Sequence, residues 1–219
     1  EHDRRVVECT DKYLVRGYLE RLGLKAILPR LYGVWDDPRD IDWARLPAQF
    51  ALKLNNGSGP KYRRLVRNKS TFDTRACVRQ LSAARRRKHG FRNGEFHYAR
   101  IKPRIIAEEY LGDDIADYKF YCFNGKVAFL SVETGRHNGG HVRAYYSTDF
   151  QPYPVQFHCD VPAPPVPFSR PNALEEMCRV AEQLSSGCAH VRVDLYGRGD
   201  AVCFGELTFS PENGFTRWN

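Results

Sequence analysis

A lysine followed by a glycine-rich loop is the first feature of the sequence that could do chemistry. In the segment FALKLNNGSG, Lys53 precedes a loop that contains Gly57, Ser58 and Gly59. A cation beside exposed backbone N–H groups can hold phosphate oxygens, and glycines allow the backbone to approach them closely. The order differs from a Walker A motif, in which the lysine follows the glycines. The segment is consistent with a phosphate site, and by itself it also fits an ordinary turn between two strands.

Two acidic residues near the C-terminus form a second candidate site. In VRVDLYGRGDAVCFGELTF, the alternation of a strand places Asp194 on the same face as Arg192. On the partner strand the same rule places Glu206 on a face with Phe204 and Thr208, so the two carboxylates are expected to converge. Mg²⁺ suits such a pair because it keeps water ligands and shares phosphate oxygens. By itself, the pattern also fits two surface acids on a hairpin.

The elements that must position these residues are predicted to mix helices with antiparallel hairpins, which indicates the α+β class. Apolar residues at helical spacing predict helices at 11–22, 75–88 and 171–187. Apolar runs bounded by turn residues predict strands at 50–54, 104–111, 118–123, 127–133, 189–196 and 201–209. Thr10 is the expected N-cap of the first helix, and Asn124-Gly125 is the strongest hairpin turn of the chain.

The composition describes a globular protein with an excess of positive charge. The 219 residues carry a net charge of +8, which favours an anionic partner such as a nucleotide, a nucleic acid, an acidic glycan or a membrane surface. No apolar run approaches the roughly 20 residues that a membrane helix needs, so no membrane span is expected. The charged segment 1–5 shows no secretory signal. Seven widely spaced cysteines without a C-x-x-C pair indicate reduced thiols and a cytoplasmic location.

Several short motifs occur in an order that resembles the ATP-grasp superfamily, and most closely its TupA-like branch. They are DK at 11–12, FALK with its glycine-rich loop, IIAEEYL at 105–111, DYKF at 117–120, VRVDLY at 191–196 and FGELTFSP at 204–211. Each motif is weak alone, but the ordered set covers most of the chain. The resemblance implies an α+β ATP-grasp fold in which two lobes with antiparallel sheets clasp ATP. It also implies one catalytic unit over 1–219, with a phosphate-loop part at about 1–111 and a metal-binding lobe at about 112–219.

By position, the resemblance assigns ATP and Mg²⁺ as cofactors and gives individual residues a role in binding them. The expected phosphate contacts are Lys12, Lys53, Gly57, Ser58 and Gly59. The expected adenine hinge comprises Glu108, Glu109, Tyr110 and Leu111, with backbone groups of Glu109 and Leu111 bonding the base, and Asp117 is expected on the ribose hydroxyls. The expected metal ligands are Asp194, Glu206 and Thr208, where Thr208 stands at a position often taken by asparagine.

Catalysis is expected to depend on Lys53 and Arg192, which would neutralise charge while phosphate is transferred. A further polar set lies where the resemblance puts the substrate, and its members are Lys119, Arg136, His137, His141 and Arg143. They are candidates to bind a carboxylate or a phosphoryl group. Each histidine could also be a loop residue without a special role. Lys119 could equally pair with an acid on the surface.

The resemblance implies an ATP-dependent carboxylate–amine ligase that forms an amide through an acyl phosphate. TupA-like members are associated with cell-surface polysaccharides, so the expected substrate is a glycan or nucleotide-sugar-linked precursor with a carboxylate or hydroxyl acceptor. A phosphotransferase, or kinase, acting on a glycan hydroxyl is the alternative, because a nucleotide site alone does not separate the two. A basic nucleic-acid-binding module is a third possibility, which the acids of the last hairpin oppose.

Overall fold

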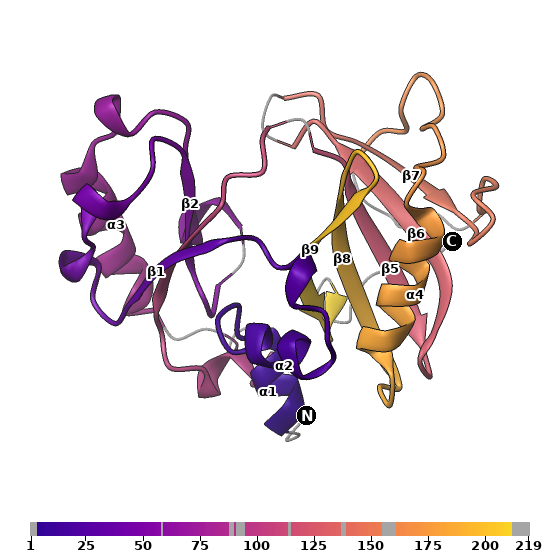
Figure 1. Ribbon diagram of the computed structural model, residues 1–219, viewed down its shortest axis with the longest axis horizontal. Coiled ribbons are helices and arrows are strands. Elements are labelled where there is room, and N and C mark those ends of the chain that lie inside the picture. Colours follow the sequence, from indigo (N-terminus) through magenta and orange to yellow (C-terminus); the bar gives the residue numbers. More distant parts are fainter. Residues whose placement is uncertain are drawn as a thin grey trace. The chain divides into compact units, whose positions relative to one another are not determined.

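The computed structural model describes residues 4–57, 59–87, 90, 95–113, 115–136, 139–154 and 161–211. The chain divides into two compact units, each with its own antiparallel sheet (Figure 1). Unit 1 comprises Glu1–Glu20 and Pro29–Leu111, and unit 2 comprises Arg21–Leu28 and Gly112–Asn219. Two antiparallel sheets with a few helices confirm the predicted α+β class. None of the helices within the described ranges has the length and apolar character that crossing a bilayer requires.

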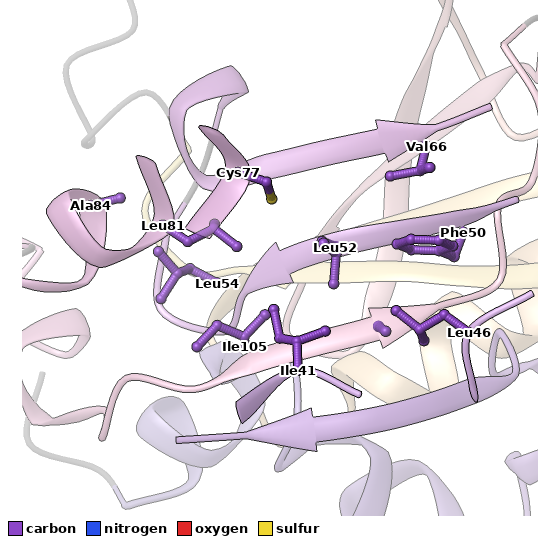
Figure 2. Close-up of a cluster of buried hydrophobic side chains, with 11 residues drawn as sticks. Ile41, Leu46, Phe50, Leu52, Leu54, Val66, Cys77, Leu81, Ala84 and Ile105 are labelled. Carbon is purple, nitrogen blue, oxygen red and sulfur yellow. The ribbon is translucent and has the colours of Figure 1, made fainter. Parts of the chain in front are cut away.

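The sheet of unit 1 has four strands in the order β1-β4-β2-β3. Their bounds are β1 Leu31–Trp35, β2 Phe50–Leu54, β3 Arg63–Val66 and β4 Ile105–Glu108. One face packs against α3, Thr74–Arg85, whose first turn is capped by Asp73. Figure 2 shows the apolar side chains of this face, including Phe50, Leu52 and Leu54 from β2. Alternation therefore leaves Lys53 and Glu108 on the opposite face of the sheet.

Two short helices begin unit 1, and they correct one expectation. The helices are α1, Arg4–Thr10, and α2, Val15–Arg21. Thr10 was expected to start a helix, but it is the last residue of α1. The predicted helix over 11–22 begins only at Val15, because Asp11 organises a turn first. Its Oδ1 accepts hydrogen bonds from the backbone nitrogens of Tyr13, at 2.8 Å, and Leu14, at 3.2 Å.

The sheet of unit 2 has five strands in the order β7-β6-β5-β8-β9. Their bounds are β5 Asp117–Phe123, β6 Lys126–Thr134, β7 Val142–Tyr146, β8 His190–Arg198 and β9 Ala201–Thr208. The predicted hairpin between β5 and β6 is confirmed, since Asn124 and Gly125 both have positive φ, at 49° and 76°. One face of the sheet is covered by α4, Leu174–Ser185, which contacts β5, β6 and β8 (Figure 1).

Short 3-10 turns complete the described elements, at Lys25–Ile27, Pro38–Asp40, Trp43–Arg45, Pro60–Tyr62, Lys69–Thr71 and Tyr98–Arg100. The face of the unit 2 sheet beneath α4 is apolar, with Phe120, Val193 and Leu195 fully buried. The other face carries Lys119 and Asp194, which are directly paired across β5 and β8. In each sheet one face contains the apolar core, and the other carries the predicted site residues: Lys53 in unit 1 and Lys119 and Asp194 in unit 2.

Candidate functional site

In unit 1, a buried carboxylate organises the predicted phosphate lysine. Glu108 Oε2 lies 2.8 Å from Lys53 Nζ, and Glu108 Oε1 lies 2.9 Å from NH1 of Arg16. The Glu108 side chain is only 6% exposed, whereas that of Lys53 is 24% exposed. A carboxylate at this depth requires charged partners, and the two cations supply them. Glu108 is also part of the expected adenine hinge, which stays a prediction, and its carboxylate pairs with Lys53 and Arg16.

The segment that carries Lys12 is bonded directly to the end of β2. The Lys12 amide donates to the carbonyl of Asn55 at 3.1 Å, two residues beyond Lys53. The Asn55 side chain, which is fully buried, donates to Asp11 Oδ2 at 2.9 Å and accepts from the Arg104 amide at 2.7 Å. The DK and FALK motifs are separate in the sequence. In the structure, Asn55 joins their backbones. That Lys12 contacts phosphate stays a prediction.

The loop after β2 contains one glycine that the packing requires. A Cβ placed on Gly57 would lie 2.6 Å from the ring of Tyr62, so a larger residue would displace the loop. Gly59 adopts φ 84° at the start of the following turn. Ser58, the third predicted phosphate contact of this loop, lies outside the described residues.

The predicted hinge follows β4 directly. The Glu109 amide donates to the Arg30 carbonyl at 2.8 Å. In a backbone hydrogen bond between Glu109 and adenine, the Glu109 carbonyl would therefore have to be the acceptor. Tyr110 and Leu111 are half-buried. The contact of this segment with adenine stays a prediction.

In unit 2, Asp194 and Glu206 lie directly opposite each other on β8 and β9. This pairing depends on a β-bulge, because Leu195 pairs with Phe204 and Gly205 is the extra residue. The expectation that Glu206 shares a face with Phe204 is therefore wrong. Phe204 is buried with Leu195, while the bulge turns Glu206 to the face of Asp194. The carboxylates converge, as expected, but through the bulge rather than through simple alternation.

Arg192 interacts with all three predicted metal ligands. Its Nε donates to Asp194 Oδ1 at 2.7 Å, and its NH2 donates to Thr208 Oγ1 at 3.2 Å and lies 3.7 Å from Glu206 Oε1. Burial lowers the pKa of Arg192, but the adjacent Asp194 outweighs it and the pKa rises well above its ordinary value. No cluster of three or more His, Cys, Asp or Glu side chains that could hold a metal occurs in the described ranges. Two carboxylates fit Mg²⁺ when phosphate oxygens and water complete its shell.

Lys119 bridges two buried acids at the centre of the same face. Its Nζ lies 2.6 Å from Asp117 Oδ2 and 2.7 Å from Asp194 Oδ2. Burial alone would lower the pKa of Lys119, but the two carboxylates raise it, so the ammonium remains charged. Burial raises the pKa of Asp117, and its Oδ1 has no hydrogen-bond partner in the described part of the chain. A buried acceptor without a partner fits a ligand hydroxyl, such as that of the ribose predicted here.

Glu133, which was not predicted from the sequence as a site residue, interacts with three of the predicted substrate residues. Its fully buried carboxylate bonds NH2 of Arg143 at 2.7 Å, NH2 of Arg136 at 2.5 Å and Nε2 of His141 at 3.1 Å. Burial raises the pKa of Glu133, but Lys119, Arg136 and Arg143 lower it to about 2. The role of these three side chains toward a substrate stays a prediction, and His137 lies outside the described residues.

The residues that sequence reasoning missed are acids and polar groups that hold the predicted ones. Glu133 ends the apolar run of β6 on the face that carries Lys119, so strand alternation was a signal for it. Arg16 follows Lys12 by four residues, which is the spacing of neighbours on a helical face. Asn55 carried no comparable signal, because its partners lie at distant positions of the sequence.

Comparison with known proteins gives one family and one fold. The sequence model of the TupA-like ATP-grasp family matches residues 2–219. No curated protein sequence matches the chain. Among solved structures, a D-alanine–D-alanine ligase from Bacillus anthracis matches with a TM-score of 0.53 and 14% identity, over 92% of this chain and 57% of that chain. An L-amino acid ligase from Bacillus licheniformis matches with a TM-score of 0.55 and 16% identity, over 92% of this chain and 43% of that chain.

An ADP complex of N5-carboxyaminoimidazole ribonucleotide synthetase matches with a TM-score of 0.57 and 13% identity, over 94% of this chain and 46% of that chain. The chain therefore spans about half the length of these solved structures. At such low identity the likeness shows the fold, which is the ATP-grasp fold expected from the motifs. The family follows from the match over almost the full sequence: the chain belongs to the TupA-like ATP-grasp family.

Proposed function

We propose that the chain is an ATP-dependent carboxylate–amine ligase that acts on a cell-surface polysaccharide precursor. The observation that carries the proposal is the direct pairing of Asp194 with Glu206 on the charged face of unit 2. Two carboxylates side by side suit Mg²⁺ bound to a polyphosphate, and family membership supplies the nucleotide. Solved relatives in fold include enzymes described as ligases, which favours ligation over phosphotransfer to a hydroxyl.

Each group of residues has a separate role in the proposal. In the proposal Lys53, Lys12 and the Gly57–Gly59 loop bind phosphate, and the segment Glu108–Leu111 binds adenine. Asp117 accepts a hydrogen bond from a ribose hydroxyl, while Asp194, Glu206 and Thr208 hold Mg²⁺. Arg192 then offsets the negative charge that accumulates as phosphate is transferred. These assignments treat 1–219 as one catalytic unit, with the phosphate residues before about residue 111 and the metal ligands after it.

Bound Mg-ATP would supply the phosphoryl group that activates a substrate carboxylate. The γ-phosphoryl group passes to the carboxylate, and an amine displaces phosphate to form the amide, so the products are ADP, phosphate and the amide. Arg136, His137, His141 and Arg143 are the proposed contacts to the acceptor, and Lys119 fixes Asp117 and Asp194. The proposal places the enzyme in the cytoplasm, where Mg-ATP is available.

The test is product analysis with nucleotide-linked uronic acids, amino acids and Mg-ATP. Mass spectrometry should detect ADP, phosphate and an amide-linked product, and a chelator should abolish the reaction. Lys53→Ala and Glu206→Ala should each remove ATP turnover, whereas Lys126→Ala should retain it, because Lys126 is an exposed partner of Glu182. Full activity of either site variant would refute the assignment. A phosphorylated glycan without an amide would replace the ligase by the kinase.

A further inference from the structure

Arg16 is a half-buried cation whose position the predicted nucleotide contacts do not explain. It lies at the start of α2, and its side chain is 16% exposed. NH1 bonds Glu108 Oε1 at 2.9 Å, and NH2 donates to the Pro29 carbonyl at 2.8 Å. The other oxygen of the same carboxylate bonds Lys53. Two cations that share one carboxylate lie close together, so Arg16 stands beside the predicted phosphate lysine.

The cluster has more positive charge and more donors than its own residues use. Arg16 and Lys53 carry two positive charges against the single negative charge of Glu108. A guanidinium has five N–H donors and an ammonium has three. Within the described ranges, Arg16 uses two of its donors and Lys53 uses one. Partly buried donors without acceptors favour binding of an anion.

We propose that Arg16 is a third cation of the nucleotide-phosphate site, held beside Lys53 by Glu108. Glu108 acts as the positioning residue: it fixes two long side chains in one place before the ligand arrives, which lowers the entropy that binding must offset. Phosphate oxygens then accept hydrogen bonds from the donors that Glu108 leaves unused. This inference rests on the proposed function, because it names a further contact for the same ATP.

A purely structural role for Arg16 makes a different prediction. In that case Arg16 would only neutralise Glu108, and removing the charge of Glu108 would make Arg16 dispensable. A double-mutant cycle with Arg16→Met and Glu108→Gln separates the two roles. If Arg16 contacts phosphate, Arg16→Met weakens ATP binding in both backgrounds, although by less in Glu108→Gln, because Glu108 no longer positions the guanidinium. If it only balances charge, the effect disappears in the Glu108→Gln background.

The experiment is calorimetric titration of the full chain with Mg-ATP, Mg-ADP and adenosine. Arg16→Met should raise the Kd for Mg-ATP about tenfold, or about 1.4 kcal/mol, and leave adenosine binding unchanged. Arg16→Lys should recover part of the loss, because it restores the charge without the planar fork. Arg39→Met is the matched control, since Arg39 pairs with Asp37 on the surface of unit 1 at 2.8 Å. Circular dichroism and the Tm of each variant report on folding.

Three results would overturn the inference: an unchanged Kd for Mg-ATP in Arg16→Met, an equal loss for adenosine, or a loss that vanishes with Glu108→Gln. If instead the wild-type chain bound no Mg-ATP at all, the proposed function itself would fail, and this contact with it. The wild-type titration therefore distinguishes the two failures before any variant is compared.

Discussion

At the scale of single residues, this protein places charged side chains in buried positions and pairs them closely. Lys119 is 2% exposed and bonds both Asp117 and Asp194. Removing one member of a buried charge group leaves its partners uncompensated in a medium that solvates them poorly. Such residues have large effects on stability, so a loss of activity in their variants has to be read together with folding measurements.

Lys119→Met tests how much this buried charge group contributes to stability. We expect it to lower the free energy of unfolding by roughly 3–5 kcal/mol, because Asp117 and Asp194 remain buried without their shared cation. Lys126→Met provides the control, since Lys126 forms a comparable 2.9 Å pair with Glu182 on an exposed surface and should change stability by less than about 1 kcal/mol. Urea unfolding of both variants measures the difference. Equal values for the two would show that burial of the Lys119 pair does not matter.

Glu133 predicts how stability depends on pH. Its pKa falls from an ordinary 4.5 to about 2 in the folded protein. A carboxyl group whose pKa is depressed by folding stabilises the protein above the unfolded pKa, and this contribution is lost as pH falls through the folded value. We therefore expect the stability difference between wild type and Glu133→Gln to be constant above about pH 5 and to shrink between about pH 5 and pH 2. Denaturant unfolding at several pH values measures this stability difference. A difference that stayed constant down to about pH 2 would contradict the lowered pKa of Glu133.

At the scale of elements, the bulge between β8 and β9 decides which side chains share the metal-binding face. Gly205 is the extra residue, and a Cβ there would lie 2.8 Å from the Asp194 carbonyl. Backbone atoms cannot move aside as the end of a flexible side chain can. The bulge therefore requires glycine at position 205. The bulge in turn makes Glu206 face Asp194.

Gly205→Ala should consequently weaken Mg²⁺-dependent ATP binding in addition to lowering stability by about 1–3 kcal/mol. Gly199→Ala, in the turn of the same hairpin, is the matched control. Gly199 has φ 61° and open space around its Cβ position, so alanine there should cost about 1 kcal/mol without changing the dependence on Mg²⁺. Titration with ATP over a range of Mg²⁺ concentrations measures the effect. A shift of the same size in both variants would remove the link between the bulge and the metal.

At the scale of the whole molecule, the positive charge is concentrated in unit 1. Unit 1 contains 23 Lys and Arg against 13 Asp and Glu, whereas unit 2 contains 11 against 13. The net charge of +8 thus comes from the unit that carries Lys12, Lys53 and Arg16. A field of this sign attracts polyphosphate, and dissolved salt screens it.

We expect the Kd for Mg-ATP to rise severalfold as NaCl increases from about 50 mM to about 500 mM, because the Debye length shortens across this range. Adenosine carries no charge, so its binding should be nearly independent of salt over the same range. Parallel titrations at each salt concentration make the comparison. A salt-independent Kd for Mg-ATP would show that the charge of unit 1 does not act on the nucleotide.

The sequence by itself determined the α+β class, most of the strands and the hairpin at Asn124-Gly125, because periodicity and turn chemistry are local. It also determined the family, since the ordered motifs from Asp11 to Pro211 are matched almost end to end by the TupA-like ATP-grasp family. The pairing of Asp194 with Glu206 was expected, although by a simpler route than the bulge that produces it.

Only the tertiary structure decided which partners hold the candidate residues. Glu108 joins Arg16 to Lys53 across 92 and 55 positions of the sequence, and Lys119 reaches Asp194 across 75. Local propensity carries no information about contacts at such separations. Burial then determines what those contacts do, because a carboxylate or ammonium removed from water keeps its charge only beside an opposite one.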